Sequence, residues 1–293
     1  MIYEVSHRTT YTYSVPVSIS HHLLHLTPRN CLHQNCGEAA LEVTPAPTVR
    51  DQDRDYFGNP VTFLTVQQPH RELLLHTLSI VDVHHRPVPE LHATATWEAV
   101  RDRVALAADS DDLEALEFTF ASEAAPFLAE AADYAAPSFP PGRPFLAGAR
   151  DLISRIHREF RYDTKATDVA TTVAEALAMR RGVCQDFAHV GLSCLRSLGL
   201  PARYVSGYLL TRPADGKEKL IGADASHAWL AVYVPEVGWV DLDPTNDLVV
   251  SDEHITLAWG RDYADVSPVS GVMFGGGEHR VAVAVDVTAI GPR

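Results

Sequence analysis

The sequence predicts an α+β protein in which an all-β, sandwich-like N-terminal domain precedes a core of helices and antiparallel strands. Three observations support this fold class. Short segments rich in Val, Leu, Ile and Thr fill residues 1–105. Helical periodicity dominates residues 109–198, and candidate strands return from residue 203 onward. Helices and strands that occur in separate runs, rather than in strict alternation, are typical of α+β proteins.

The N-terminal region begins with MIYEVSHRTTYTYSV, which alternates polar and apolar residues. This pattern predicts a strand rather than a signal peptide, since it contains no long apolar run. Further strands are expected at Val61–Val66 and Leu73–Val83. The segment Asp55–Pro60 predicts a hairpin or sheet-crossing loop, because Gly and Asn tolerate positive φ and Pro ends ladder pairing.

Helices are expected in the middle of the chain. Residues 106–144 are rich in Ala, Glu and Leu and end in a Pro-rich stretch, which predicts a helical connector. Between Phe145 and Phe160, apolar residues recur every three or four positions, so one face of this helix should pack and the other should be solvated. Thr172 and Glu175 match a capping box at the start of a shorter helix.

Candidate strands fill much of the remaining chain, at Arg203–Leu210, His227–Val234 and Trp239–Leu242. The last two are joined by Pro235–Gly238, whose length and composition suit a hairpin. Alternating valines from Val281 to Val287 predict a final strand but do not indicate which sheet it joins. The predicted organisation is therefore a β-domain at 1–105, a helical connector at 106–144, an α+β core at 145–268 and a C-terminal strand at 269–293.

The composition excludes some classes of partner. The chain has 24 Lys and Arg residues against 38 Asp and Glu residues, and its net charge is -14. A surface of that sign repels phosphate backbones and anionic lipids, and the basic residues are not clustered. We therefore expect neither a nucleic acid nor a membrane as partner, and we expect a cytoplasmic location. The sequence does not indicate the oligomeric state.

A reactive thiol is predicted at Cys184. The four cysteines in 293 residues are too few for a disulfide scaffold, so each is expected to be a free thiol. An apolar stripe runs from Cys184 to Leu198 and is closed by Gly199 and Pro201, which places Cys184 at a helix N-terminus. The positive end of the helix dipole favours a thiolate there, and the N–H groups can face the oxyanion of a tetrahedral intermediate.

His227 and Asp243 are the predicted partners of this thiol. His227 begins one strand of the expected hairpin, and Asp243 ends the other just before Pro244 turns the chain away. Such an arrangement lets the carboxylate accept from one imidazole nitrogen while the other nitrogen faces Cys184. Asp243 could also form an Asx turn. Asp241 is the nearest alternative acid, since it lies two residues earlier on the same sheet face.

Three segments carry a resemblance to a known family. They are Gly182–His189 (GVCQDFAH), Ala223–Trp229 (ADASHAW) and Gly238–Asn246 (GWVDLDPTN). In this order they resemble the catalytic blocks of the transglutaminase-like superfamily, in which the nucleophile, base and orienting acid would fall on Cys184, His227 and Asp243. The first hundred residues, with HRTTYTY, LTPR and DYFGNPV, are similar to the β-domain of bacterial members.

The resemblance implies a papain-like core and a cysteine-dependent acyl-transfer enzyme. Cys184 would form a thioester from a peptide, protein or small amide substrate and pass the acyl group to water, as a peptidase or amidase does. Transfer to an amine, giving transamidation or cross-linking, is the first alternative. A non-catalytic module that binds a peptide or protein is the second. We expect no cofactor and no metal, since the sequence has no acidic loop like that of an EF-hand.

Other residues are given lesser roles. Cys194 is expected to pack inside its helix. Cys31 and Cys36 lie near several histidines, but one such pair is a weak metal-site pattern. His189 and Asp224 are expected to be structural. Tyr162 and Gln185 are the remaining candidates for a second oxyanion donor; neither is favoured.

Overall fold

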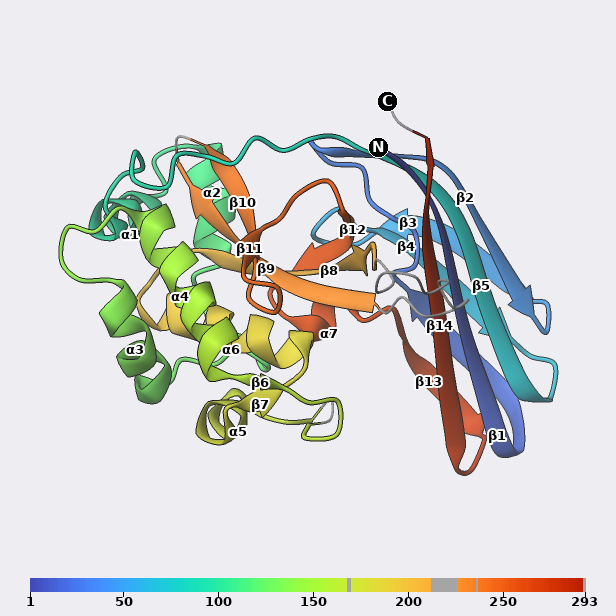
Figure 1. The fold of residues 1–293 in the computed structure, drawn as a ribbon. Coiled ribbons are helices and arrows are strands. Elements are labelled where there is room, and N and C mark those ends of the chain that lie inside the picture. Colours follow the sequence, from blue (N-terminus) through green and yellow to red (C-terminus); the bar gives the residue numbers. More distant parts are fainter. Residues whose placement is uncertain (168–169, 212–225, 236, 292–293) are drawn as a thin grey trace, which may run out of the picture.

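A computed structural model describes residues 1–167, 170–211, 226–235 and 237–291. Its N-terminal part is one curled antiparallel sheet, which we call the N-terminal sheet (Figure 1). The central strand is β1, Ile2–Leu24, and the sheet has the order β2-β5-β1-β4-β3, with β13 and β14 as two further strands that pair with β1. The other strands are β2 (Gln34–Thr44), β3 (Val49–Arg54), β4 (Pro60–Val66), β5 (His70–Val83), β13 (Val269–Gly275) and β14 (His279–Gly291).

The C-terminal tail completes this N-terminal sheet. Strand β14 pairs with the first half of β1 from Ile2 to Tyr13, and β13 pairs with its second half from Val17 to Leu24. The expected strand at the end of the chain is therefore present, and its partner is the very first strand. The loop expected at Asp55–Pro60 is the hairpin turn between β3 and β4, with Gly58 at φ 74°.

The β structure of the N-terminal region ends at Val83, earlier than the expected residue 105. The difference arises because Trp97–Leu106 form helix α1, in which Thr96 accepts a hydrogen bond from the Ala99 N–H and Val100 is buried. The remaining helices are α2 (Ser110–Glu117), α3 (Ala129–Ala135), α4 (Phe145–Glu159), α5 (Val173–Met179), α6 (Cys184–Ser197) and α7 (Tyr263–Val266), with a short 3₁₀ helix at Ala136–Ser138. None of the helices in the described ranges is both long and apolar enough to span a membrane.

The helices pack around a second antiparallel sheet, the core sheet, with the order β11-β10-β9-β8-β12. Its strands are β8 (Ala202–Leu209), β9 (Ser226–Val234), β10 (Gly238–Asp243), β11 (Leu248–Val249) and β12 (His254–Gly260), and a separate parallel pair is formed by β6 (Arg161–Tyr162) and β7 (Arg181–Gly182). Helix α6 lies on β9, and its Gly191 allows the close approach, since a Cβ there would stand 2.4 Å from a Leu230 methyl group. The predicted α+β class is confirmed.

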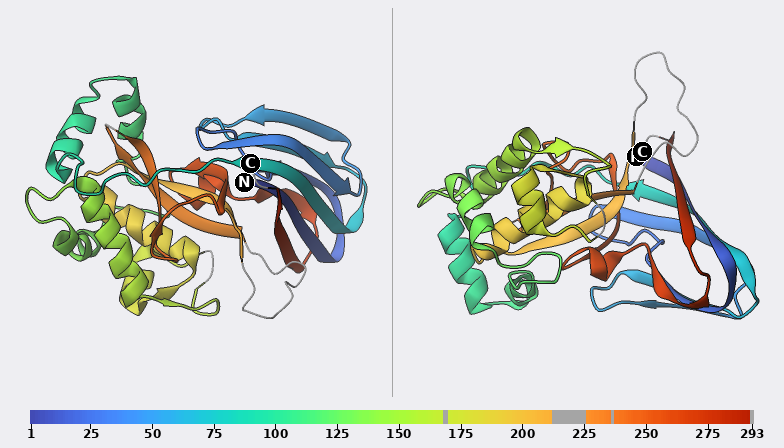
Figure 2. Two further views of the ribbon diagram at one scale, coloured as in Figure 1. Left: turned by 45° about the horizontal axis from the view of Figure 1, so that its top comes forward. Right: turned by 90° about the horizontal axis from the view of Figure 1, so that it is seen from below.

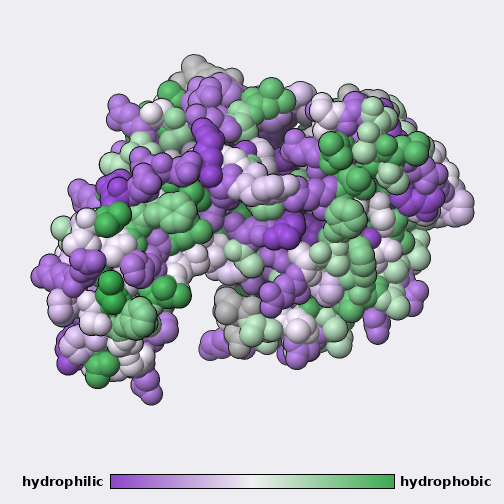
Figure 3. Space-filling view, turned by 180° about the vertical axis from the view of Figure 1, so that it is seen from behind, coloured by the Kyte–Doolittle hydropathy of each residue, from purple (hydrophilic) through white to green (hydrophobic). Residues whose placement is uncertain are grey.

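The N-terminal sheet and the core sheet share a small apolar core. Tyr3 and Val5 of β1 pack with Tyr208 of β8 and Ile255 of β12, and each is 2% exposed or less. The two parts therefore lie side by side along β8 and β12 (Figure 2). The rear face of the molecule is hollowed between the low end of the N-terminal sheet and the helical part (Figure 3).

Candidate active site

Cys184 is the first residue of helix α6, as the sequence predicts. The start of the helix is held by Asp186, whose Oδ2 accepts hydrogen bonds from the Val183 N–H and the Thr167 hydroxyl, both at 2.7 Å. Gly182 lets the chain pass this carboxylate, because a Cβ at that position would lie 2.4 Å from Asp186 Oδ2. The first N–H groups of a helix have no partner within the helix, so they remain available beside the thiol.

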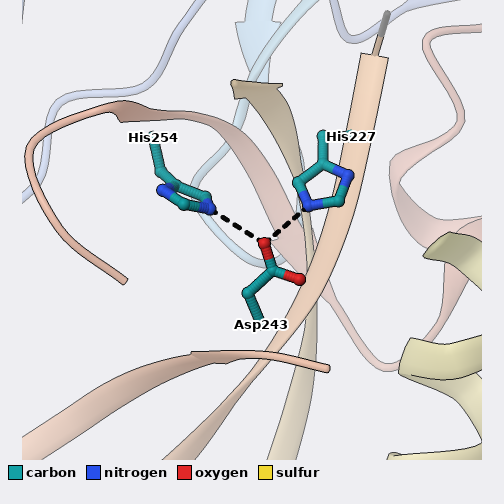
Figure 4. Close-up of side chains that lie close together, drawn as sticks. All are labelled: His227, Asp243 and His254. Atoms are coloured by element: carbon teal, nitrogen blue, oxygen red, sulfur yellow. Dashed lines mark hydrogen bonds and ion pairs between the residues drawn. The ribbon is translucent and has the colours of Figure 1, made fainter. Parts of the chain in front are cut away.

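His227 and Asp243 are hydrogen-bonded at the ends of β9 and β10. The Nε2–H of His227 donates to Asp243 Oδ2 at 2.8 Å (Figure 4). Asp243 is fully buried, and its Oδ1 accepts from the backbone N–H groups of Thr245 at 2.8 Å and Asn246 at 3.1 Å. The residue thus forms the Asx turn and orients the imidazole at the same time.

The electrostatics of the pair favour charged forms. Burial alone would lower the pKa of His227, but hydrogen bonds with Asp243 and Cys184 outweigh burial and raise its pKa to about 10. Burial would likewise raise the pKa of Asp243, but the hydrogen bonds from His227 and His254 hold it well below its ordinary value. Because Nε2 of His227 is engaged by Asp243, Nδ1 is the nitrogen left for the Cys184 thiol. A protonated imidazole in this position favours the thiolate.

His254 is a member of the site that the sequence reasoning missed. It begins β12, its side chain is buried, and its Nε2–H donates to Asp243 Oδ2 at 3.0 Å (Figure 4). Asn246 also donates to this oxygen, through Nδ2 at 2.7 Å. The only local signal for His254 is a histidine at a strand start after an acidic turn, which does not distinguish it from other histidines of the chain.

Within the described ranges, His227, Asp243 and His254 are the one group of three or more such side chains close enough to share a metal ion. The hydrogen-bond pattern argues for a proton-bridged cluster instead. A metal-bound histidine ordinarily donates its second N–H to an acceptor. The Nδ1 of His254 is buried and has no hydrogen-bond partner, so a metal on Nε2 would leave a buried donor unsatisfied. With the proton on Nε2, the hydrogen bond to Asp243 is made and no donor is stranded.

The other candidate residues lie apart from this cluster or serve the fold. Asp241 forms an ion pair with Arg86. Cys194 is fully buried, which raises its pKa to about 12. His189 is also buried, which lowers its pKa to about 4, and its Nε2 accepts the Tyr263 N–H at 3.2 Å.

Tyr162 and Gln185, the two weaker oxyanion candidates, precede and follow Cys184 in the chain. Tyr162 is half exposed, and its ring packs edge-on against Phe187 of helix α6. Gln185 follows Cys184 in the same helix and, together with His189, lines a cavity of about 620 Å³. Residues 223–225, which include Asp224, lie outside the described residues.

Comparison with known proteins agrees with this architecture. Residues 3–82 match the bacterial transglutaminase-like N-terminal region, and residues 134–244 match the transglutaminase-like superfamily. An uncharacterised protein of Mycobacterium tuberculosis is 44% identical over 97% of this chain and 92% of its own length. A protein-glutamine gamma-glutamyltransferase of Pseudomonas aeruginosa is 34% identical over 105 residues, which are 33% of this chain and 15% of that protein.

A solved structure shares the fold over the whole chain. The crystal structure of a candidate cysteine protease from Cytophaga hutchinsonii covers 100% of this chain and 92% of its own, with a TM-score of 0.78 and 20% sequence identity. At that identity the likeness concerns the fold, which includes both the N-terminal sheet and the core sheet. Taken with the two family matches and the long mycobacterial relative, the chain belongs to the transglutaminase-like superfamily, in the form that carries the bacterial N-terminal region.

Proposed function

We propose that Cys184, His227 and Asp243 form a catalytic triad that cleaves amide bonds through a thioester on Cys184. The observation that carries the proposal is the position of the His227 imidazole, which is hydrogen-bonded to a buried carboxylate and whose pKa is raised by its interactions with that carboxylate and with the Cys184 thiol. A nucleophile, a base and a group that orients the base are the parts that acyl-transfer enzymes of this kind need.

The first half of the reaction releases an amine. The Cys184 thiolate attacks the carbonyl carbon of the substrate, a C–S bond forms, and negative charge moves to the carbonyl oxygen. The N-terminal N–H groups of α6 stabilise that oxyanion. His227 then gives its proton to the leaving nitrogen, the C–N bond breaks, and a thioester remains on Cys184.

The second half depends on the acceptor. Water attacks the thioester while His227 takes its proton, the C–S bond breaks, and the carboxylic acid leaves. This hydrolytic route, acting on a peptide, protein or small amide, is our first assignment. An amine that reaches the thioester by the same path gives a new amide. The partial match to a protein-glutamine gamma-glutamyltransferase favours this second route as the alternative.

Thiol labelling tests the triad without knowledge of the substrate. We expect iodoacetamide to modify Cys184 rapidly at neutral pH and Cys194 only after unfolding, as read by mass spectrometry of peptides. Slow and equal labelling of both thiols would instead support a non-catalytic binding module. His227→Phe is the companion variant, and it should slow the labelling of Cys184 because it removes the proton acceptor.

The acceptor is tested with an N-blocked Gln-Gly dipeptide as acyl donor, with and without hydroxylamine. Free acid as the main product supports hydrolysis. Hydroxamate that forms in competition with bulk water supports transamidation. Cys184→Ala should abolish both products, and Cys194→Ala is the matched control that should retain them. Equal turnover by Cys184→Ala and the wild type would refute the assignment of the nucleophile.

A further inference from the structure

We propose that His254 is a positioning residue for Asp243, and that the N-terminal sheet holds His254 in place through Tyr3 and Gln34. The inference rests on the proposed triad and deepens it. It assigns a role in the active site to the N-terminal sheet, which contributes no residue to the triad itself.

Three hydrogen-bond donors crowd around one carboxylate oxygen of Asp243. Oδ2 of Asp243 accepts hydrogen bonds from His227 at 2.8 Å, from His254 at 3.0 Å and from Asn246 at 2.7 Å. The His254 side chain is 1% exposed and Asp243 is 0% exposed, so water cannot replace a missing donor without rearrangement. His254 therefore restricts where Asp243 can point and, through it, where His227 can point (Figure 4).

His254 is held by two anchors from the N-terminal sheet. The Tyr3 hydroxyl, on β1, donates to the carbonyl oxygen of Asp252 at 2.9 Å. Gln34, on β2, makes a two-way bond with Thr256: its Nε2 donates to the Thr256 carbonyl at 2.7 Å, and its Oε1 accepts the Thr256 N–H at 2.8 Å. Both anchors come from the N-terminal sheet and both are buried. The residues that they bind, Asp252 and Thr256, lie two residues before and two residues after His254.

His254 also affects the imidazole of the triad. A hydrogen bond from His254 takes up part of the negative charge on Oδ2, so less of that charge is available to His227. The charged or titratable groups around the cluster include Cys184 on α6, the two histidines, Asp247, which forms an ion pair with Arg150, and Arg150 and His157 on α4. The last two bind the turn after Asp243, through hydrogen bonds to the carbonyl oxygens of residues 247 and 245 at 2.7 and 2.9 Å. Loss of the His254 donor alone should therefore strengthen the bond between Asp243 and His227 and make the imidazolium harder to deprotonate.

The test is the pH dependence of Cys184 carboxymethylation by iodoacetate. This anionic reagent depends on the neighbouring imidazolium, so the rate should fall at alkaline pH where His227 loses its proton. In His254→Phe, which keeps a ring against Trp229 but removes the donor, we expect this alkaline limb to move up by roughly half to one pH unit, the size expected for part of a charge-assisted hydrogen bond. His254→Gln keeps an N–H at a similar distance along the side chain and should restore the wild-type limb.

The anchors are tested through the same limb. Gln34→Leu should move the alkaline limb of the pH profile in the same direction as His254→Phe does, by a smaller amount. When Gln34→Leu is combined with His254→Phe, it should add little further shift, because Gln34 acts through His254. Tyr3→Phe removes a single hydroxyl and serves as the second variant if Gln34→Leu does not fold. Gln52→Leu is the matched control, since Gln52 is an exposed glutamine in the same N-terminal sheet.

Each outcome bears on one proposal. A wild-type enzyme whose Cys184 reacts slowly, with no alkaline limb, overturns the triad. A wild-type limb that His254→Phe leaves in place overturns the role of His254 and leaves the triad standing. A full additional shift from Gln34→Leu in the His254→Phe background shows that the N-terminal sheet does not act through His254, which overturns that part of the inference.

Discussion

Asp243→Asn is the substitution whose effect the structure defines most closely. Asp243 accepts five hydrogen bonds: two on Oδ1 from backbone N–H groups and three on Oδ2 from side chains. An asparagine amide has the same shape but replaces one oxygen by an NH₂ group. In either orientation, that group faces at least two donors that previously met an acceptor.

The size of the effect follows from that count. Each buried donor left unsatisfied costs about 1–3 kcal/mol, and part of the total is offset because a charge is no longer buried. We expect the free energy of unfolding to fall by about 2–4 kcal/mol. His227 then loses the carboxylate that opposes its burial, so its pKa should drop below the ordinary value near 6.5. Turnover should fall roughly 10³–10⁴-fold, as when the orienting carboxylate of other triads is lost.

Urea unfolding measures the loss of stability, and the rate of Cys184 alkylation at pH 7 reports the change in the protonation of His227. Asp241→Asn is the matched control on the same strand, because it removes the ion pair with Arg86 and leaves the triad intact. An Asp243→Asn variant that retains both the stability and the thiol reactivity of the wild type would contradict the prediction. Equal loss of thiol reactivity in the two aspartate variants would contradict it as well.

Three further predictions concern pH, packing and the second thiol. The pKa of His227 is raised to about 10 in the folded state, so the contribution of its protonated form to stability should be complete below pH 6.5 and lost as pH rises toward 10. The urea midpoint measured at pH 6, 8 and 10 should therefore decline less with pH in His227→Phe than in the wild type. Gly207→Ala should destabilise the protein by about 2–3 kcal/mol, and by more than Gly191→Ala does. The reason is that a Cβ at residue 207 would lie 2.2 Å from a backbone oxygen, whereas a Cβ at residue 191 would meet the end of a flexible side chain. Thermal unfolding of both variants measures the difference. Cys194→Ser should lower the melting temperature without changing Cys184 alkylation, because a hydroxyl replaces a fully buried thiol; an unchanged melting temperature would count against its packing role.

Much of the candidate site could be predicted because it depends on short stretches of sequence. The stripe that ends at Gly199 and Pro201 locates the start of α6 and therefore Cys184. The hairpin between β9 and β10 brings His227 and Asp243 to the same end of the core sheet. Periodicity and turn chemistry act over a few residues, so they can be read without knowing what the segment packs against.

The pattern of residue types predicted the secondary structure less well where a helix cap, burial or a proline decides it. Residues 97–105 were expected to be β structure but lie in helix α1, since the cap at Thr96 and the burial of Val100 prevail over the weak strand pattern of the region. The Ala-rich run that begins at residue 121 is helical only at Ala129–Ala135, which form α3, because Pro126 interrupts the run.

The fold class and the three residues of the proposed triad could be predicted from the sequence alone. The tertiary structure alone decided that β13 and β14 complete the N-terminal sheet, that His254 shares the carboxylate of Asp243, and that Tyr3 reaches Asp252 across a separation of 249 residues. The physical reason is the range of the interactions. Capping, periodicity and turns are set by neighbours in the chain, whereas a sheet partner or a second hydrogen-bond donor is chosen by packing between segments that the sequence does not place together.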